Sequence, residues 1–275
     1  MPSNLHTPRE NLLLAALPPA DYERLLPHLE VLTLPLGWAI YETGSKQSSV
    51  YFPTDSIISH VHITASGNST DVAITGNDGL VGIPSVMGGE TSLYRAIVRS
   101  AGSAYRLQYA EVKKAFENGG GVQDLLLRHT QALMTQTAQT VVCNRHHSVE
   151  QRLCRWLLMS IDRLPGEQLN ATQELIANML GVRREGVTEA ASQLQSAGLI
   201  RYSPGHITIL DRPKMEAWVC ECYAVVKRET NRLLPQKQTG SNRARKPPLP
   251  SRTTINPIYV NEQTGARQHA MNAKA

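Results

Sequence analysis

The sequence predicts an α+β protein with an N-terminal antiparallel β-roll, one long helix, and a C-terminal pair of short helices followed by a β-hairpin. Three observations predict this order. Short β-rich runs separated by glycines fill residues 31–109, a stretch without Gly or Pro spans 122–142, and a helix–glycine–helix pattern occupies 172–196. The length of 275 residues leaves room for more than one domain with a core of its own.

Composition excludes several classes of protein. No apolar run approaches the roughly 20 residues that a membrane-spanning helix needs, and we expect a cytoplasmic protein without a secretory signal. The four cysteines form no CxxC pair, which disfavours a disulfide framework and a four-thiolate zinc site. The basic pI of about 9.1 comes largely from residues 235–275, which hold seven Lys or Arg and one Glu. A nucleic-acid partner must therefore be inferred from a motif.

Two helical signals precede the roll. Thr7 and Pro8 are typical of the first residues of a helix, which Pro18 and Pro19 end, and 21–29 predicts a second short helix. The strands that we expect are 39–41, 50–52, 57–63, 71–74, 96–98 and 104–107. A helical pattern then returns at 111–116.

Residues 122–142 predict one long helix with a narrow stripe at steps of three and four. This spacing is typical of a coiled-coil seam, although His, Gln and Thr within it weaken the pattern. We expect the stripe to join two parallel copies of the chain, since a small roll offers it no other obvious partner. Packing of the helix on its own domain fits the periodicity equally well. The predicted interface residues are Val122, Leu126, His129, Leu133, Thr137 and Thr140.

The strongest functional signal lies in residues 169–210. Thr172 is a good cap for a helix with apolar residues on one face, Gly181 allows a tight turn, and a second helix is expected from about Arg184 to Ser196. Two short apolar runs flank a turn at 203–205 and predict a two-strand wing. Together these elements predict a winged helix-turn-helix, in which the second helix enters the major groove of DNA.

This segment resembles the helix-turn-helix of the Crp/Fnr family of bacterial transcription regulators, above all in QELIANMLGVRREGVTEAASQLQSAGLI. GWAIYETGS and SVYFPTDSIIS resemble the opening of the family's β-roll, and GNDGLVGIPSVMGG resembles its phosphate-holding loop. The resemblance covers about residues 10–230. It implies a cyclic-nucleotide-binding-like sensory domain at 1–121, a dimerisation helix at 122–146 and a DNA-binding domain at 147–234. We expect the basic tail, 235–275, to be disordered.

The resemblance also implies which residues meet DNA. Arg184 and Glu185 match the family's Arg-Glu pair, which reads a base pair, while Glu189 stands where well-known members have a second Arg. We expect base readout by Arg184, Glu185, Thr188 and Glu189, and contacts to the DNA backbone by Thr172, Gln173, Arg183 and Ser192. The implied partners are double-stranded DNA, a second copy of the chain and RNA polymerase.

The phosphate loop departs from the family's cyclic-nucleotide binders, which supply a Glu for the ribose and an Arg followed by Ser or Thr for the phosphate. Here Leu80-Val81 lies between Gly79 and Gly82, and Ala96 follows Arg95. We therefore expect cyclic AMP and cyclic GMP to bind poorly or not at all, and the effector is unknown. The possible effector pocket comprises Gly79, Gly82, Tyr94 and Arg95. An iron–sulfur cluster is not expected, since members that hold one carry N-terminal cysteines, and the first cysteine here is Cys143.

We expect no metal site and no enzymatic activity. His146 and His147 are neighbours that face different ways on a helix, and the sequence shows no third ligand beside them. The Cys220-Glu221-Cys222 segment predicts a packed helix more than a redox pair. No Ser-His-Asp, HExxH or carboxylate pair stands in a persuasive context. The alternative function is a small-molecule-binding sensor whose helical C-terminal domain mediates protein–protein contacts; a hydrolase that uses the glycine loop ranks third.

Overall fold

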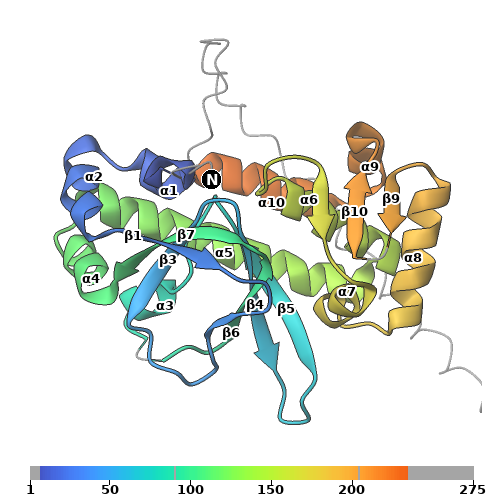
Figure 1. Cartoon of the computed structure of the whole chain (residues 1–275), viewed down its shortest axis with the longest axis horizontal. Helices are drawn as coiled ribbons and strands as arrows, with labels where there is room; N and C mark the ends of the chain where they lie inside the picture. The colour runs from blue at the N-terminus through green and yellow to red at the C-terminus, as the bar shows by residue number, and fades with distance from the viewer. Residues whose placement is uncertain (1–6, 90, 204, 235–275) are drawn as a thin grey trace, which may run out of the picture. The chain divides into compact units, whose positions relative to one another are not determined.

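Two antiparallel sheets form the N-terminal roll in the computed structural model, which describes residues 7–89, 91–203 and 205–234 (Figure 1). One sheet has the order β1-β7-β3 and the other the order β2-β6-β4-β5. Apolar side chains from both sheets pack together as one buried cluster. The strands are β1 (Glu30–Leu34), β2 (Ala39–Tyr41), β3 (Ser49–Pro53), β4 (Ile57–Ile63), β5 (Ser69–Thr75), β6 (Arg95–Ser100) and β7 (Gly102–Gln108).

The six strands predicted from the sequence are all present, and β1 is an additional strand that the sequence reasoning did not predict. Strand β1 has mostly exposed or half-buried residues, so its sequence lacks a clear apolar alternation. It is held instead by its pairing with β7, which runs from Glu30 opposite Arg106 to Leu34 opposite Gly102.

Short helices cover one end of the roll. The single helix expected over 7–17 is divided at Asn11, whose side chain accepts hydrogen bonds from the backbone N–H groups of Leu13 and Leu14. The Asn11 amide also donates to the carbonyl oxygens of Pro53 and Gly79, at 2.9 and 2.8 Å, and so ties this end to the roll. The helices are η1 (Pro8–Glu10), α1 (Leu12–Ala16), α2 (Pro19–Leu25), η2 (Leu26–His28), α3 (Ile83–Val86) and α4 (Tyr109–Glu117).

Helix α5 (Gly120–His146) is the long helix that the sequence predicts; its 27 residues span about 40 Å. Its inner face is buried within the same chain. Val122 and Leu126 belong to a core formed with α1, α4 and the roll, and His129 is hydrogen-bonded to the backbone of Leu80. The premise that the stripe has no partner in its own chain is therefore wrong: Val122, Leu126, His129 and Thr140 are buried in the single chain.

The C-terminal elements follow the predicted order, and the wing has three strands instead of two. Ser148 caps α6 together with Gln151, which forms a capping box with it. The extra strand, β8, pairs with β10 because Leu169 turns into the core opposite Ile207. The elements are α6 (Val149–Ile161), β8 (Gln168–Asn170), α7 (Gln173–Leu180), α8 (Arg184–Ser196), β9 (Ile200–Ser203), β10 (His206–Ile209), α9 (Arg212–Trp218) and α10 (Glu221–Leu233).

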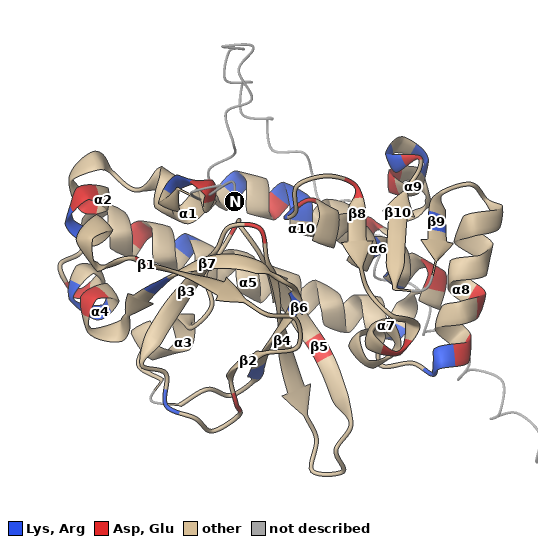
Figure 2. Ribbon diagram, in the orientation of Figure 1, with Lys and Arg blue, Asp and Glu red and all other residues tan. Residues whose placement is uncertain are grey.

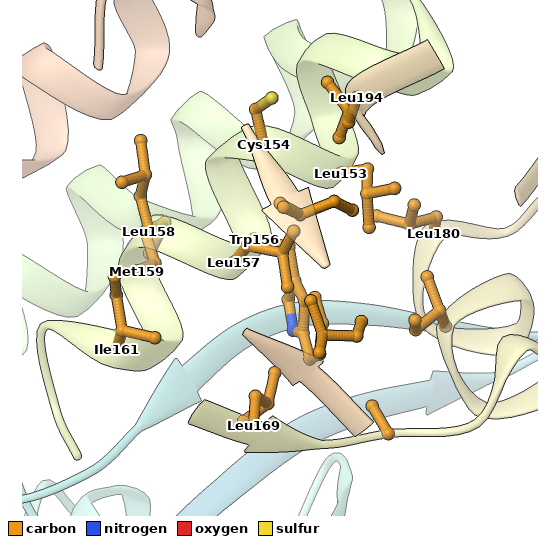
Figure 3. Close-up of a cluster of buried hydrophobic side chains, with 14 of the residues drawn as sticks. Leu153, Cys154, Trp156, Leu157, Leu158, Met159, Ile161, Leu169, Leu180 and Leu194 are labelled. Carbon is orange, nitrogen blue, oxygen red and sulfur yellow. The ribbon is translucent and has the colours of Figure 1, made fainter. Parts of the chain in front are cut away.

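Helix α6 is the centre of the C-terminal core. Every residue from Leu153 to Ile161 is buried, so the helix is surrounded on all sides. Figure 3 shows Leu157 and Trp156 of α6 among side chains from the neighbouring elements, including Leu169, Leu180 and Leu194. Burial of this many large apolar side chains positions α7 and α8 relative to α6.

The described residues between 7 and 234 belong to one compact unit, so the division into parts at 121/122 and 146/147 stays a prediction. The predicted disordered tail, 235–275, lies outside the described residues. Among the described helices, none is long and apolar enough to cross a membrane.

Candidate nucleic-acid interface

The helix-turn-helix forms from local signals that the sequence displays. The hydroxyl of Thr172 accepts a hydrogen bond from the Leu175 N–H at 3.2 Å, which caps α7. Gly181 ends the helix with a φ of +61°, a left-handed conformation that favours glycine. The Val182 N–H then returns to the Ala177 carbonyl at 3.0 Å, and α8 begins two residues later.

Helix α8 has one buried and one exposed face. Val187, Ala190, Ala191 and Leu194 are buried against the core. All of the DNA-contacting residues expected on α8 lie on its exposed side, where several of them line a shallow, open groove. The exposed residues are Arg184, Glu185, Thr188, Glu189 and Ser192.

Gln173 joins the first helix to the second. Its side-chain oxygen accepts a hydrogen bond from the Thr188 hydroxyl at 3.1 Å and a long one from the Arg184 guanidinium at 3.5 Å. Thr188 also donates to the Arg184 carbonyl within α8. Arg184 and Thr188 are therefore oriented by a side chain from α7.

The wing adds Tyr202, which the sequence reasoning missed. Its backbone N–H donates to the Gln195 side chain at 2.9 Å, which fastens the wing to α8. Burial raises the pKa of the Tyr202 hydroxyl, and the Gln173 backbone and the charge of Arg184 oppose that rise. The hydroxyl thus lies beside the start of α7, where DNA phosphates bind in helix-turn-helix proteins. Tyr202 and Gln173 are about 30 residues apart in the sequence, so local sequence patterns do not indicate that they are close.

Charges of both signs meet at the start of α8 (Figure 2). Arg183 and Arg184 are exposed there next to Glu185. Arg201 adds an exposed positive charge on β9, whereas the Lys214 ammonium is hydrogen-bonded to the Ala197 carbonyl at the end of α8. The positive charge is thus concentrated at the N-terminal end of the helix, and Glu189 places a negative charge one turn further along.

The four residues expected to form an effector pocket each contact a different part of the roll or of α5. Arg95 forms an ion pair with Glu42, with the two atoms 2.9 Å apart. Tyr94 is buried and stacks on His60, with ring centroids 4.4 Å apart. Gly79 lies against His129, since a Cβ built on this glycine would be 2.6 Å from the imidazole Cε1, and Gly82 has a φ of +108°.

Aromatic side chains fill the space between the two sheets of the roll. Tyr41 and Tyr51 form an edge-on pair with centroids 5.8 Å apart. His60, which stacks on Tyr94, is buried, and burial lowers its pKa to about 3, so the ring is neutral. Its Nε2 is paired with the Thr75 hydroxyl at 2.9 Å. His60 thus offers no positive charge to an anionic ligand inside the roll.

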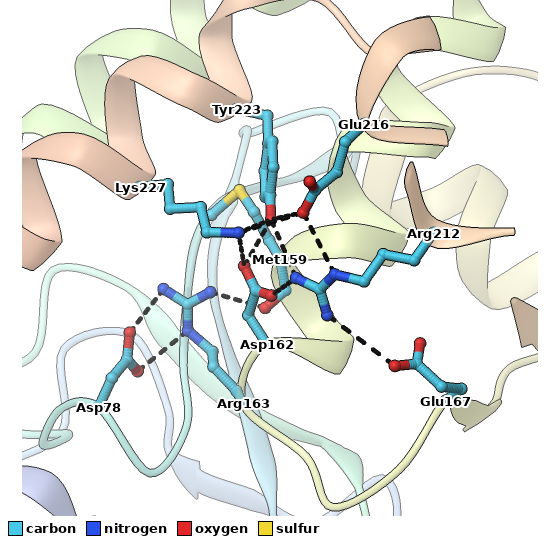
Figure 4. Close-up of polar contacts among 9 residues, drawn as sticks. All are labelled: Asp78, Met159, Asp162, Arg163, Glu167, Arg212, Glu216, Tyr223 and Lys227. Atoms are coloured by element: carbon cyan, nitrogen blue, oxygen red, sulfur yellow. Dashed lines mark hydrogen bonds and ion pairs between the residues drawn. The ribbon is translucent and has the colours of Figure 1, made fainter. Parts of the chain in front are cut away.

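A network of charged groups joins the end of α6 to α9 and α10 (Figure 4). Arg212 pairs with Asp162 and with Glu216, and the Tyr223 hydroxyl donates to Asp162 at 2.9 Å. Burial raises the pKa of this hydroxyl, which stays protonated. Arg163, the next residue after Asp162, takes no part in these pairs. Its guanidinium forms an ion pair with the Asp78 carboxylate of the roll at 2.7 Å.

The expectation that His147 has no companion ligands is wrong. Cys143, Cys220 and Cys222 surround it, and the four ligand atoms lie within 4.8 Å of one another. His146, as expected, faces solvent. The sequence reasoning missed the group because its two halves are more than 70 residues apart.

A capped helix, a glycine turn, a second helix with an exposed polar face and a three-stranded wing together define a winged helix-turn-helix DNA-binding domain. In this chain the domain follows a β-roll and a long helix. Residues 151–218 match the family model of the Crp-like helix-turn-helix domain. No curated protein sequence matches the chain.

Solved structures with the same fold include FixK2 from Bradyrhizobium japonicum (17% identity, TM-score 0.61), covering 70% of this chain and 98% of that one. The c-di-GMP responsive global regulator CLP from Xanthomonas campestris (16%, 0.56) covers 70% and 99%. A CRP/FNR-family transcriptional regulator from Thermus thermophilus (18%, 0.53) covers 68% and 97%. The chain thus contains a Crp-like helix-turn-helix domain, and its fold is that of these solved structures.

Two glycines of this domain should respond oppositely to the same substitution. Gly181→Ala forces a side chain into the left-handed turn and should lower the free energy of unfolding by ~1–2 kcal/mol. Gly186→Ala lies in α8 with open space around its Cβ and should raise stability by up to ~1 kcal/mol. Urea unfolding measures both. Equal effects of the two substitutions would contradict the turn geometry.

Proposed function

We propose that the protein is a homodimeric regulator that reads a two-fold related DNA site with α8. The observation that carries this proposal is the division of α8 into a fully buried face and an exposed face that begins with Arg184. An exposed helix face oriented by its neighbours is what a major-groove reader requires. RNA polymerase as a further partner stays a prediction from the resemblance.

Arg184 and Glu185 are suited to one G·C pair. An arginine can donate two hydrogen bonds to guanine O6 and N7, and a glutamate can accept one from cytosine N4. Glu189 lies one turn further along the exposed face and cannot pair with those guanine atoms. The proposed half-site therefore has a G·C pair opposite Arg184 and Glu185 and no guanine preference opposite Glu189.

The proposed base contact predicts different results for two adjacent arginines. Arg184→Ala should weaken binding to the preferred site by ~1–3 kcal/mol and relax selectivity at one base pair. Arg183→Ala, the matched control, should weaken binding to all sequences alike and flatten the dependence of affinity on salt. Gel-shift titrations on a site selected from random DNA measure both. If Arg184→Ala gives the uniform loss instead, Arg184 contacts phosphate.

The dimer interface that we propose is a neighbouring stripe of α5, which shares only Thr137 with the stripe expected from the sequence. Leu127, Met134 and Val141 are 44, 63 and 64% exposed in the single chain and follow one another at intervals of seven residues. Thr130 and Thr137 fall between them at heptad positions and donate their hydroxyls to carbonyls of their own helix. A seven-residue apolar repeat with no unpaired hydroxyl is suited to a second copy of the same helix.

A charge in this exposed stripe should separate the subunits. Leu127→Asp or Met134→Asp should convert the dimer to a monomer at micromolar concentration, because each buries a carboxylate against an apolar partner. Light scattering measures the molar mass. Leu93→Asp is the control, since Leu93 is 73% exposed outside α5 and its variant should remain dimeric. A wild-type monomer, or dimeric stripe variants, would exclude this interface.

We further propose that the roll does not use a cyclic mononucleotide as effector. Arg95 is paired with Glu42 on the surface, and Tyr94 fills the interior with His60. The loop between Gly79 and Gly82 buries Leu80 and Val81 where a ribose needs a polar partner. The effector itself stays unidentified.

Calorimetric titration of the full-length dimer with cyclic AMP or cyclic GMP should show no binding with a dissociation constant at or below the micromolar range. Desolvating the ligand's phosphate and ribose without a paired charge and hydrogen bonds removes most of the binding free energy. A micromolar or tighter constant for either nucleotide would show that Arg95 leaves Glu42 to meet the phosphate.

A further inference from the structure

Four potential metal ligands meet where the long helix ends and the last helix begins. Cys143 and His147 are one turn apart at the end of α5. Cys220 and Cys222 belong to the first turn of α10, which packs alongside α5 (Figure 1). The three cysteines are buried and carry free thiols, and the His147 side chain is 12% exposed.

The distances within this cluster match those of a single tetrahedral ion. The Sγ atoms of Cys143 and Cys220 are 3.6 Å apart, and Cys222 Sγ is 3.5 Å from His147 Nδ1. A tetrahedral zinc with bonds of about 2.3 Å to sulfur and about 2.0 Å to nitrogen separates its ligand atoms by about 3.5–3.8 Å. All four atoms lie within 4.8 Å of one another. This is too compact for an iron–sulfur cluster, whose thiolates bind different iron atoms.

The groups around the cluster are those that support a bound metal. His147 directs its other nitrogen, Nε2, to Glu221 Oε1 at 3.3 Å, as metal-bound histidines commonly do with a carboxylate. Arg155 places a positive charge near Cys143 and Cys222, which offsets the net negative charge of zinc bound by three thiolates. Glu221 is 72% exposed, so the His147 side of the cluster reaches solvent and provides a path for the ion.

We propose that Cys143, His147, Cys220 and Cys222 bind one Zn²⁺ ion. The set of three sulfurs and one imidazole nitrogen is one of the common structural zinc sites, in which no position remains open for substrate. Zinc binding requires the three thiols to lose their protons, which pass to solvent or buffer, and involves no change of oxidation state.

The position of the site suggests what the ion does. His147 lies two residues before α6, and Cys220 lies two residues after α9, so the ligands lie at the entry and the exit of the segment that holds the helix-turn-helix. An ion bound here fastens both ends of that segment to α5. This structural consequence rests on the proposed DNA-binding function, whereas the metal site itself does not.

The test adds zinc to the reduced, full-length protein from which bound metal has been removed with a chelator, and measures how much zinc each chain binds. We expect one zinc per chain and a higher melting temperature on zinc addition. Cobalt should replace zinc and give the intense visible bands of a tetrahedral thiolate site. Cys143→Ser and His147→Ala should lose stoichiometric binding. Their matched controls, Cys154→Ser and His146→Ala, should keep it, because neither side chain belongs to the cluster.

A substitution outside the four ligands keeps the proposal testable if a ligand substitution prevents folding. Glu221→Gln changes an exposed side chain and should weaken zinc binding about ten- to a hundredfold, with unchanged stability of the zinc-free protein. The proposal is overturned if the reduced protein binds no zinc, if it takes up iron in preference, or if the cluster variants bind as tightly as their controls. Gel shifts on the same samples report DNA binding separately, so failure of one function is distinguishable from failure of the other.

Discussion

The rest of the structure depends on how helix α5 divides its surface among the roll, helix α10 and an exposed side. Its first half packs Val122, Leu125 and Leu126 into the core of the roll, and α10 lies along another side. The remaining side exposes Leu127, Met134 and Val141. A helix of 3.6 residues per turn can present three such surfaces only if each is a narrow stripe. A shift of one residue in the rotation of α5 therefore exchanges a core position for a surface position.

Two buried polar residues set this rotation. Gln136 donates to the Ile74 carbonyl at 3.0 Å and accepts from the Ile74 N–H at 3.1 Å, so it pairs both free backbone groups of a residue in the edge strand β5. His129 is hydrogen-bonded to the backbone of Leu80. Leaving such a buried backbone group unpaired costs about 1–3 kcal/mol, so turning α5 away from this register is unfavourable. The same His and Gln weakened the coiled-coil pattern in the sequence, because they serve the roll and not a second helix.

Sequence reasoning succeeded where the determining contacts are local. The cap at Thr172, the left-handed Gly181 and the capping box of Ser148 each depend on residues within a few positions, and α8 begins and ends where the sequence predicts. It failed where the determining contact is distant. Strand β1 is defined by a partner about 70 residues away, and Cys143 meets Cys220 across 77 residues. Which stripe of α5 faces its own roll is likewise decided by Ile74 and Leu80, and periodicity cannot identify them.

The ion pairs that join α10 to the helix-turn-helix segment and the proposed zinc site that would join α10 to α5 differ in strength. The ion pairs of Lys227 with Glu216 and Asp162 are partly exposed, and pairs of this kind contribute roughly 0–1 kcal/mol each. A structural zinc site contributes far more, with apparent binding free energies of about 10–16 kcal/mol in zinc-finger peptides. The ion pairs leave the attachment of α10 largely to apolar packing through Tyr223 and Val226. With zinc bound to the proposed ligands, the attachment at the start of α10 becomes the strongest polar contact between α5 and the segment that carries α8, and the stability of that junction then follows the supply of metal.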